Sequence, residues 1–286
     1  MSGTVALVTD STAMLPSETA RARGVTVVPL QVVVGATSYD EGLDAEATPE
    51  TIAAALREWT PVSTSRPTPA HFLEAYRAAQ DSGAEEIVSI HLSADMSGTF
   101  ESAQLAAKEL AVPVHVVDTR QLGMATGLAV LAAADVVDAG GSGEAAARAA
   151  LERALRTTSL FYVDTLEYLR RGGRIGAAAA LLGSALAVKP LLQIVDGRIA
   201  TREKVRTAAR ALSRLEELAV SAAGSDQVDV AVAHLANPDR AAALAANLSR
   251  RLEENLGERE LSLGEVGAVI GAHVGPGMVA VVVCPR

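Results

Sequence analysis

Residues 91–103 read HLSADMSGTFESA and join an apolar segment to an Ala-rich one. The preceding residues 86–92 form a short β-branched run typical of a buried parallel strand, whereas residues 100–110 favour a helix. Ser97 therefore falls where a strand becomes a helix, and there the backbone N–H groups lack internal partners and the helix dipole is positive. This position predicts an anion site at Ser97. The plainer alternative is that Ser97 only caps its helix.

The alternation of strands and helices on both sides of this stretch favours an α/β fold, with a parallel, doubly wound sheet in the first half. Strands are predicted over residues 4–9, 25–34, 86–92 and 112–117, and helices over 48–59, 100–110, 123–139 and 144–156, with two more that begin near Pro16 and Pro69. We expect a loop after residue 34 and a stiff, extended loop at 61–69, where three prolines and four hydroxyl residues occur together. A Gly-rich break at 140–143 predicts a domain boundary close to residue 156. The predicted domains are 1–156 and 157–286.

The second half predicts an α/β domain with a mixed or antiparallel sheet. Asp196-Gly197 lies between apolar runs and is a strong hairpin signal. Further strands are predicted over 160–164, 228–234, 260–265 and 279–283, and helices over 176–186, 205–222 and 238–256. Residues 270–277 predict a Gly-rich loop that carries His273.

Composition narrows the classes of partner. The chain has 286 residues, 49% of them hydrophobic and only 3% aromatic, and its net charge of −9 would repel nucleic acid and anionic membranes. The single cysteine, Cys284, cannot form an intrachain disulfide, and no Cys and His residues have metal-ligand spacing. We expect a cytoplasmic protein with no metal or cofactor, no nucleic-acid partner and no stable membrane insertion.

Four polar positions are candidates for binding: Thr64-Ser65, Ser97-Gly98, Arg174 and His273. Taken singly, Arg174 could be an exposed turn residue and His273 a structural histidine. Together, two hydroxyls, a guanidinium and an imidazole can surround a carboxylate or a phosphoryl oxygen and supply the donors that a partly buried anion needs.

Five motifs in this order closely resemble the DegV family. They are TDSTAMLP at 9–16, TSRPTP at 64–69, SGTFESA at 97–103, YLRRGGRI at 168–175 and GAHVGPG at 271–277. The resemblance covers essentially the whole chain. It departs from the family pattern at Met14, where an acid is usual, and at Arg66, where Gln is usual.

The resemblance implies a two-domain α/β protein that encloses one long-chain fatty acid in an apolar tunnel, with the carboxylate between the domains. Thr64 and Ser97 would then hydrogen-bond the carboxylate, and Arg174 and His273 would form the second pair of the network. Ser65 and Gly98 would support them. Residues 177–187 would help to shape the tail pocket.

The better understood members of this family are fatty-acid-binding subunits of a bacterial two-component fatty acid kinase that serves phospholipid metabolism, and the resemblance implies the same role for this chain. Such a subunit presents the acid to a separate ATP-binding subunit. The sequence fits this division because no Gly-x-x-x-x-Gly-Lys-Ser/Thr run follows any predicted strand. We therefore expect a lipid-binding subunit and not a complete enzyme.

A basic cluster of Arg202, Lys204 and Arg206 could dock the kinase subunit. The alternative is a solvated helix start. Two rival functions also remain open. A serine hydrolase would combine Ser97 and His273 with Asp10 or Asp118, although no Gly-x-Ser-x-Gly elbow is present. A binder of small phosphorylated metabolites would need a compact polar cavity instead of a long apolar one.

Overall fold

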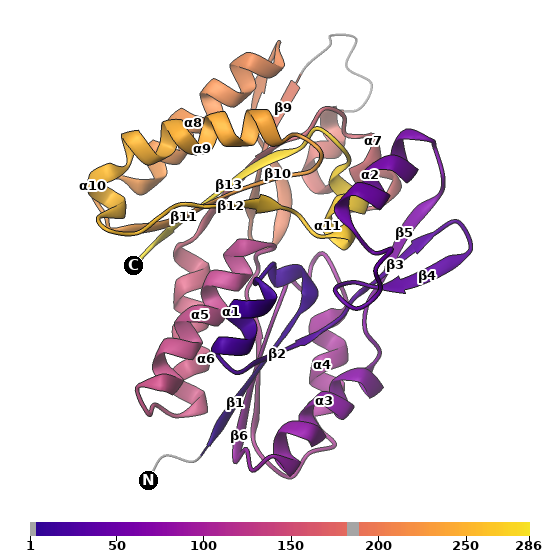
Figure 1. Cartoon of the computed structure of the whole chain (residues 1–286), viewed down its shortest axis with the longest axis vertical. Coiled ribbons are helices and arrows are strands. Elements are labelled where there is room, and N and C mark those ends of the chain that lie inside the picture. The colour runs from indigo at the N-terminus through magenta and orange to yellow at the C-terminus, as the bar shows by residue number, and fades with distance from the viewer. Residues whose placement is uncertain (1–3, 182–188) are drawn as a thin grey trace.

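A four-stranded parallel sheet forms the core of the first half. The computed structural model describes residues 4–181 and 189–286. Strands β1 (Val5–Asp10), β2 (Val25–Val28), β6 (Glu86–His91) and β7 (Val114–Asp118) pair in the order β2-β1-β6-β7, all parallel. Helices cover both faces of this sheet, so the predicted doubly wound architecture is confirmed (Figure 1).

The two helical layers differ in character. One layer contains α5 (Met124–Asp138) and α6 (Gly143–Arg156), which pack through fully buried alanines such as Ala129, Ala133 and Ala150. These small side chains let the two helices approach each other and the sheet closely. The other layer contains α3 (Pro69–Asp81) and α4 (Thr99–Ala107), where Phe72 and Tyr76 fill the space against the sheet.

A six-stranded mixed sheet organises the second half. Its strands are β8 (Thr158–Tyr162), β9 (Lys189–Val195), β10 (Arg198–Val205), β11 (Val228–His234), β12 (Ser262–Glu265) and β13 (Val279–Pro285). They pair in the order β10-β9-β8-β13-β11-β12, antiparallel everywhere except between β11 and β12. The mixed sheet and the β9–β10 hairpin confirm the predictions, and Asp196-Gly197 forms the turn. The proposed boundary between residues 156 and 157 falls between α6 and β8 and remains a prediction.

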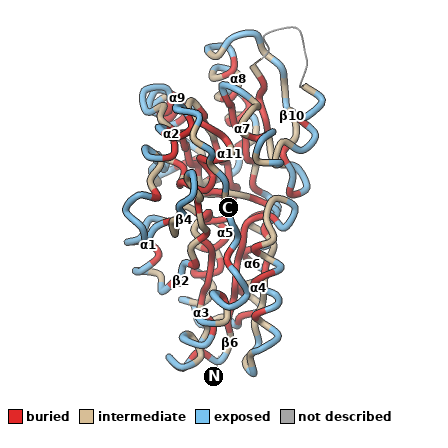
Figure 2. Tube along the Cα trace, turned by 90° about the vertical axis from the view of Figure 1, so that its right-hand side faces the viewer, coloured by how far each residue is buried: buried red, intermediate tan, exposed pale blue. Residues whose placement is uncertain are grey.

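One face of the mixed sheet is closed by α8 (Ala208–Ala223), α9 (Pro238–Arg251) and α10 (Glu253–Leu256). The other face turns toward α7 (Glu167–Arg171) and α11 (Ala268–Val274). Figure 2 shows buried segments running through both halves, with the exposed segments on the outside. No helix within the described ranges is both long enough and apolar enough to cross a bilayer.

A separate three-stranded sheet corrects the predictions for residues 25–69. It contains β3 (Gln31–Val34), β4 (Thr37–Asp40) and β5 (Val62–Ser65), in the order β4-β3-β5. The single predicted strand 25–34 is wrong because Pro29 has no N–H for a sheet ladder, and the next N–H, that of Leu30, bonds to Ser11 Oγ at 3.0 Å. The predicted loops contain β4 and β5, which β3 pairs on its two sides.

The small sheet packs on the second half of the chain. Leu30 and Val32 share a core with α2 (Pro49–Arg57) and with Ala268, Val269 and Ala272 of α11. Two short elements complete the first half, the 3-10 helix η1 (Ser11–Ala13) and α1 (Ser17–Ala22).

Three further predictions of local structure are wrong in part. The first part of the expected Gly-rich loop, residues 270–274, belongs to helix α11, because its apolar side chains pack against Leu235 and Ile52 and override the glycines, whereas residues 275–277 form a turn after the helix. Arg202 and Lys204 of the basic cluster lie on strand β10 and not in a helix, whereas Arg206 follows the strand and lies directly before Thr207, the N-cap of α8. The predicted helix 176–186 begins as a 3-10 helix, η2 (Gly176–Leu181), and the remainder of that prediction lies outside the described residues.

Candidate functional site

The candidate site lies at the carboxyl edge of the parallel sheet. Strand β1 ends in η1, and β6 ends in the loop 92–98 that leads into α4. Because the carboxyl ends of parallel strands meet at one edge, the polar residues that follow β1 and β6 are brought together there. Helix α11 and the segment after α7 approach the same edge from the second half.

The four predicted binding side chains line one cavity, which we call the head cavity. Thr64 comes from β5, Ser97 from the loop before α4, Arg174 from the segment after α7 and His273 from α11. The other lining residues are Thr12, Leu30, Leu92, Met96, Leu122, Leu169, Ile199, Val269, Ile270 and Val274. The lining of the head cavity is therefore apolar apart from a few hydroxyls, one imidazole and one guanidinium.

His273 and Thr64 hydrogen-bond each other across the two halves. The distance between His273 Nε2 and Thr64 Oγ1 is 2.8 Å, and His273 Nδ1 is buried with no hydrogen-bond partner among the described residues. Burial, with a smaller contribution from the charge of Arg174, lowers the pKa of His273 to about 4, so the ring is neutral at pH 7. With its proton on Nε2, the ring donates to Thr64 and leaves the Thr64 hydroxyl free to donate into the cavity.

Arg174 is anchored by backbone carbonyls on both sides of the site. Its Nε donates to Met96 O at 3.2 Å, and its Nη1 donates to Gly172 O at 2.5 Å. These bonds hold the guanidinium beside the head cavity in a fixed orientation while the remaining N–H groups stay available.

Ser97 combines the two interpretations that its sequence position allowed. Its Oγ accepts a hydrogen bond from Thr99 N at 3.3 Å and bonds to Thr99 Oγ1 at 2.8 Å, so it meets the first N–H of α4 from the residue before the N-cap, Gly98. The same side chain also lines the head cavity. Contact with the helix start and cavity lining therefore coexist.

The two supporting residues lie outside the cavity lining. Ser65 is exposed, because successive side chains on a strand point to opposite faces and Thr64 takes the inner one. Gly98 lies beneath Arg66, which donates to Gly98 O at 3.2 Å and to Glu101 Oε2 at 2.9 Å. Arg66, one of the two departures from the family pattern, thus covers the Ser97–Gly98 turn from outside.

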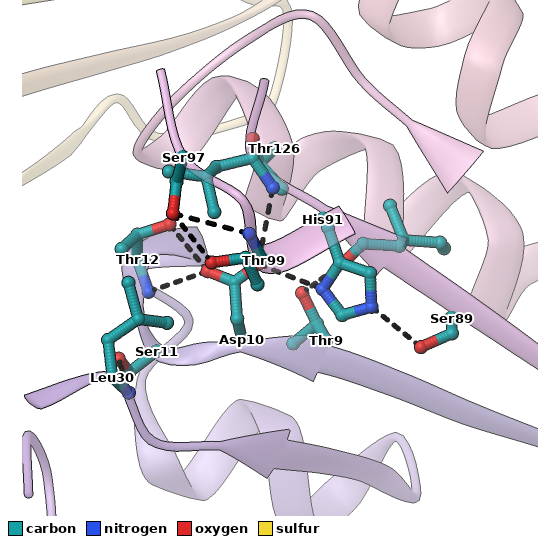
Figure 3. A network of polar contacts seen from close by, with 12 residues as sticks. Thr9, Asp10, Ser11, Thr12, Leu30, Ser89, His91, Ser97, Thr99 and Thr126 are labelled. Atoms are coloured by element: carbon teal, nitrogen blue, oxygen red, sulfur yellow. Dashed lines mark hydrogen bonds and ion pairs between the residues drawn. The ribbon is translucent and has the colours of Figure 1, made fainter. Parts of the chain in front are cut away.

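Sequence reasoning missed Thr12 as a lining residue, together with the buried network behind it (Figure 3). Asp10, which is fully buried, accepts hydrogen bonds from Thr12 N at 3.1 Å, Thr12 Oγ1 at 2.5 Å and Leu92 N at 3.2 Å. His91 Nδ1 lies 2.9 Å from the same carboxylate, and its Nε2 lies 2.7 Å from Ser89 Oγ. The available signal was the polar run Asp10-Ser11-Thr12 at the end of the first strand.

An almost entirely apolar cavity adjoins the head cavity, and we call it the tail cavity. The two share Leu122, Ile199, Ile270 and Val274 as lining residues. The inner face of the mixed sheet supplies most of the remaining lining, including Phe161, Ile194, Ala231, Ala233 and Ala280. Residues 177–181 do not line it, and residues 182–187 of that prediction lie outside the described part of the chain.

The cavities are narrow, with volumes of about 70 Å³ for the tail cavity and about 50 Å³ for the head cavity. A ligand of drug size needs several hundred cubic ångströms, so lining side chains must move to admit one. Met14, Met124 and Met278 are suited to such movement because their side chains are unbranched and adaptable. Met14, the other departure from the family pattern, thus contributes an apolar side chain to this cavity.

A catalytic triad is not assembled in the described structure. His273 bonds to Thr64, whereas Asp10 is paired with His91, and Asp118 accepts from the backbone N–H groups of Ala94 and Arg120. Within residues 4–181 and 189–286, no group of three or more His, Cys, Asp or Glu side chains is arranged to hold a metal ion.

Sequence comparison places this architecture in a known family. The profile described as "Uncharacterised protein, DegV family" matches residues 4–286. The chain belongs to the DegV family. It is 55% identical over 286 residues, which is 100% of both chains, to a DegV domain-containing protein of Streptomyces coelicolor. The resemblance seen in the sequence motifs is confirmed.

Solved DegV structures share the whole fold. A fatty-acid-binding DegV family protein from Thermus thermophilus has a TM-score of 0.90 and 35% identity, with 99% of each chain covered. DegV from Bacillus subtilis, a fatty acid binding protein, also has a TM-score of 0.90, with 31% identity and 100% of each chain covered. The predicted two-domain α/β architecture is thereby confirmed.

The low pKa of His273 predicts a pH-dependent stability. In the unfolded chain, the imidazole of His273 has a pKa near 6.5 and is protonated below that pH. In the native protein its pKa is about 4, so the ring stays neutral until the pH falls to about 4. Acid therefore favours the unfolded state. Between pH 7 and pH 5, the free energy of unfolding should fall by about 2 kcal/mol more in the wild type than in His273→Gln. Chemical denaturation at several pH values measures this difference, and parallel pH profiles would contradict it.

Position 172 is predicted to require glycine, because any larger side chain would collide with the imidazole of His273. A Cβ at Gly172 would lie 2.1 Å from His273 Nδ1, although the backbone there is helical and accepts alanine. Gly172→Ala should therefore displace the imidazole and break its bond to Thr64, which imidazole NMR would detect as a changed His273 resonance. Gly264→Ala is the matched control, since Gly264 has no left-handed φ and no described atom lies within 4 Å of a Cβ there. An unchanged His273 resonance in Gly172→Ala would refute the packing argument.

Proposed function

We propose that this chain binds one long-chain fatty acid, with its carboxylate in the head cavity and its acyl chain in the tail cavity. The observation that carries the proposal is the junction of these two cavities. Thr64, Ser97, Arg174 and His273 gather around one, and apolar side chains line nearly all of the other. The fatty-acid-binding DegV proteins of Thermus thermophilus and Bacillus subtilis, which share the fold along its whole length, support it.

The two cavities would contribute differently to binding. A sixteen-carbon chain leaving water gains about 0.8 kcal/mol for each buried methylene, so the tail dominates the affinity. Burying the carboxylate costs several kcal/mol unless donors and a positive charge meet it. Arg174 would supply the charge, and the Thr64 and Ser97 hydroxyls would supply donors, so the head cavity would set the orientation of the acid.

The apolar tail cavity also separates this proposal from its rivals. A site for a small phosphorylated metabolite should be compact and polar throughout, whereas Ser159 is the one hydroxyl residue among the described residues that line the tail cavity. A serine hydrolase needs an imidazole beside its serine, and His273 is bonded to Thr64 instead.

We further propose that the chain is a non-catalytic subunit that presents its fatty acid to a separate ATP-dependent kinase. The resemblance to the DegV family and the lack of a Gly-x-x-x-x-Gly-Lys-Ser/Thr sequence support this division. Phosphorylation of the carboxylate would then require the partner to reach the head cavity, and both proteins would work in the cytoplasm.

The basic cluster at the end of β10 is the proposed docking surface for that partner. Arg202 and Lys204 on the edge strand β10 and Arg206 directly after it are exposed and form no ion pair within the described part of the chain. Arg210 of α8 lines the same surface hollow as Lys204 and Arg206, whereas Arg214 is neutralised by Glu203 and Glu217. Unpaired cations on an acidic protein would attract an acidic partner surface.

Removing the positive charge of the head cavity should weaken fatty-acid binding. Arg174→Gln is expected to raise the dissociation constant for palmitate by roughly tenfold to a hundredfold, because a hydrogen bond to a charged group is worth about 1.5–3 kcal/mol. Its affinity for hexadecanol, which has no charge, should change much less. Titration calorimetry on delipidated protein measures both.

Arg148→Gln is the matched control, because Arg148 is exposed and, in the described part of the chain, its only ion pair is with Glu152, one helical turn away. The proposal fails if the wild type does not bind palmitate. It also fails if inorganic phosphate displaces palmitate more effectively than oleate does.

Charge reversal in the basic cluster should weaken association with the kinase subunit while leaving palmitate affinity unchanged. Lys204→Glu combined with Arg206→Glu is expected to raise the KM of the kinase for the loaded chain by roughly tenfold, because loss of complementary charge slows association. The rate of acyl-phosphate formation in the reconstituted pair measures this effect. Lys108→Glu combined with Arg148→Glu is the control, and an unchanged KM in the basic-cluster variant would exclude docking through this cluster.

A further inference from the structure

The turn of the β9–β10 hairpin lies against the loop that carries Ser97. Asp196 and Gly197 form this turn with φ values of 49° and 77°, and Gly197 is buried. Ser93, also buried, donates from its Oγ to Gly197 O at 2.7 Å. A residue in the second half of the chain is thereby bonded directly to the loop 92–98 of the first half.

Ser93 organises the backbone that leads to Ser97. Its carbonyl accepts hydrogen bonds from Met96 N at 3.0 Å and Ser97 N at 3.1 Å, and its Oγ accepts one from Asp95 N at 3.2 Å. Its own N–H donates to Gln121 O at 2.9 Å. Every polar atom of Ser93 is therefore used, and two of these bonds fix the turn that ends at the Ser97 backbone.

The β9–β10 turn packs closely against the loop 92–98, and an exposed ion pair beside this contact strengthens it. A Cβ at Gly197 would lie 2.5 Å from Ser93 Oγ, so only glycine fits there. Arg198, the next residue, donates from Nη2 and Nε to Asp95 Oδ1 at 2.6 Å and 3.0 Å. Ile199, one residue further, lines both cavities. The hairpin thus connects the Ser97 loop to the cavity walls.

We infer that Ser93 and Gly197 are positioning residues for the head cavity: the hairpin turn holds the loop 92–98 so that the Ser97 hydroxyl meets the carboxylate. The inference rests on the proposed fatty-acid binding and extends it to residues that do not touch the ligand. Among the described residues, the Ser97 side chain hydrogen-bonds only to Thr99, so its position depends on the backbone that Ser93 fixes.

The first test replaces Ser93 by alanine and follows the carboxyl carbon of bound [1-¹³C]palmitate by NMR. Ser93→Ala removes the bonds to Gly197 O and Asp95 N. It should lower palmitate affinity about fivefold, as expected for a lost hydrogen bond, and shift the carboxyl resonance. Ser142→Ala is the control, because it removes the cap of α6 and costs comparable stability far from the cavity. The control should leave the affinity and the resonance unchanged.

The second test is a double-mutant cycle. Gly197→Ala places its Cβ against Ser93 Oγ, and Ser93→Ala removes that obstacle. Alanine at a φ of 77° is strained in both backgrounds, so the cycle isolates the contact between the two residues. The loss of palmitate affinity caused by Gly197→Ala should be smaller in the Ser93→Ala background than in the wild type.

The outcomes separate this inference from the proposed function. A wild-type chain that does not bind palmitate overturns both. A wild type that binds palmitate, with an unshifted carboxyl resonance in Ser93→Ala and additive losses in the cycle, overturns the positioning role alone. A shifted resonance and a non-additive cycle establish it.

Discussion

The hydrogen bond between Thr64 and His273 joins two parts of the chain that are 209 residues apart, and the head cavity depends on it. Thr64 is fixed by the pairing of β5 with β3, and His273 is fixed in the last turn of α11. Burial keeps the imidazole neutral, which lets it share a hydrogen bond with a hydroxyl instead of demanding a carboxylate partner. A neutral ring leaves Arg174 as the charged group that sets the electrostatic character of the cavity.

Helix α11, which carries His273, is held in place at its N-terminus by a buried carboxyl group. Glu41, which follows β4, is buried and accepts a hydrogen bond from Val269 N at 2.9 Å in the first turn of the helix. Burial raises the pKa of this carboxyl, while its hydrogen bonds at the start of α11 oppose the rise. Gly267 lets the carboxylate approach this closely, since a Cβ there would lie 2.3 Å from Glu41 Oε1. The small sheet and α11 therefore form one packed unit that carries both Thr64 and His273.

Local sequence patterns were sufficient for much of the fold and for the candidate residues. The β-branched run 86–92 identified a buried parallel strand, and Asp196-Gly197 identified the hairpin. Thr64, Ser97, Arg174 and His273 were selected by residue type and by family resemblance, and all four line one cavity. Their roles toward a ligand remain proposals.

Other features depend on contacts that are distant in sequence, so local patterns could not reveal them. The small sheet forms because β3 pairs with β5, which lies about thirty residues later in the sequence. Segment 268–274 is a helix because Leu235 and Ile52 pack against it. Thr12 lines the head cavity with its hydroxyl bonded to Asp10, and Asp10 is itself held by His91, which is distant in sequence. The charges of residues 202–206 could not distinguish a strand from a helix start.

The central claim is that the two adjoining cavities together form a site for one fatty acid. The most direct measurement is organic extraction of the purified full-length chain, with mass spectrometry of the extract and quantification against protein. The account predicts long-chain fatty acids in a ratio near one per chain, or uptake to that ratio when palmitate or oleate is added. Recovery of no fatty acid, together with no uptake of either acid, would contradict it.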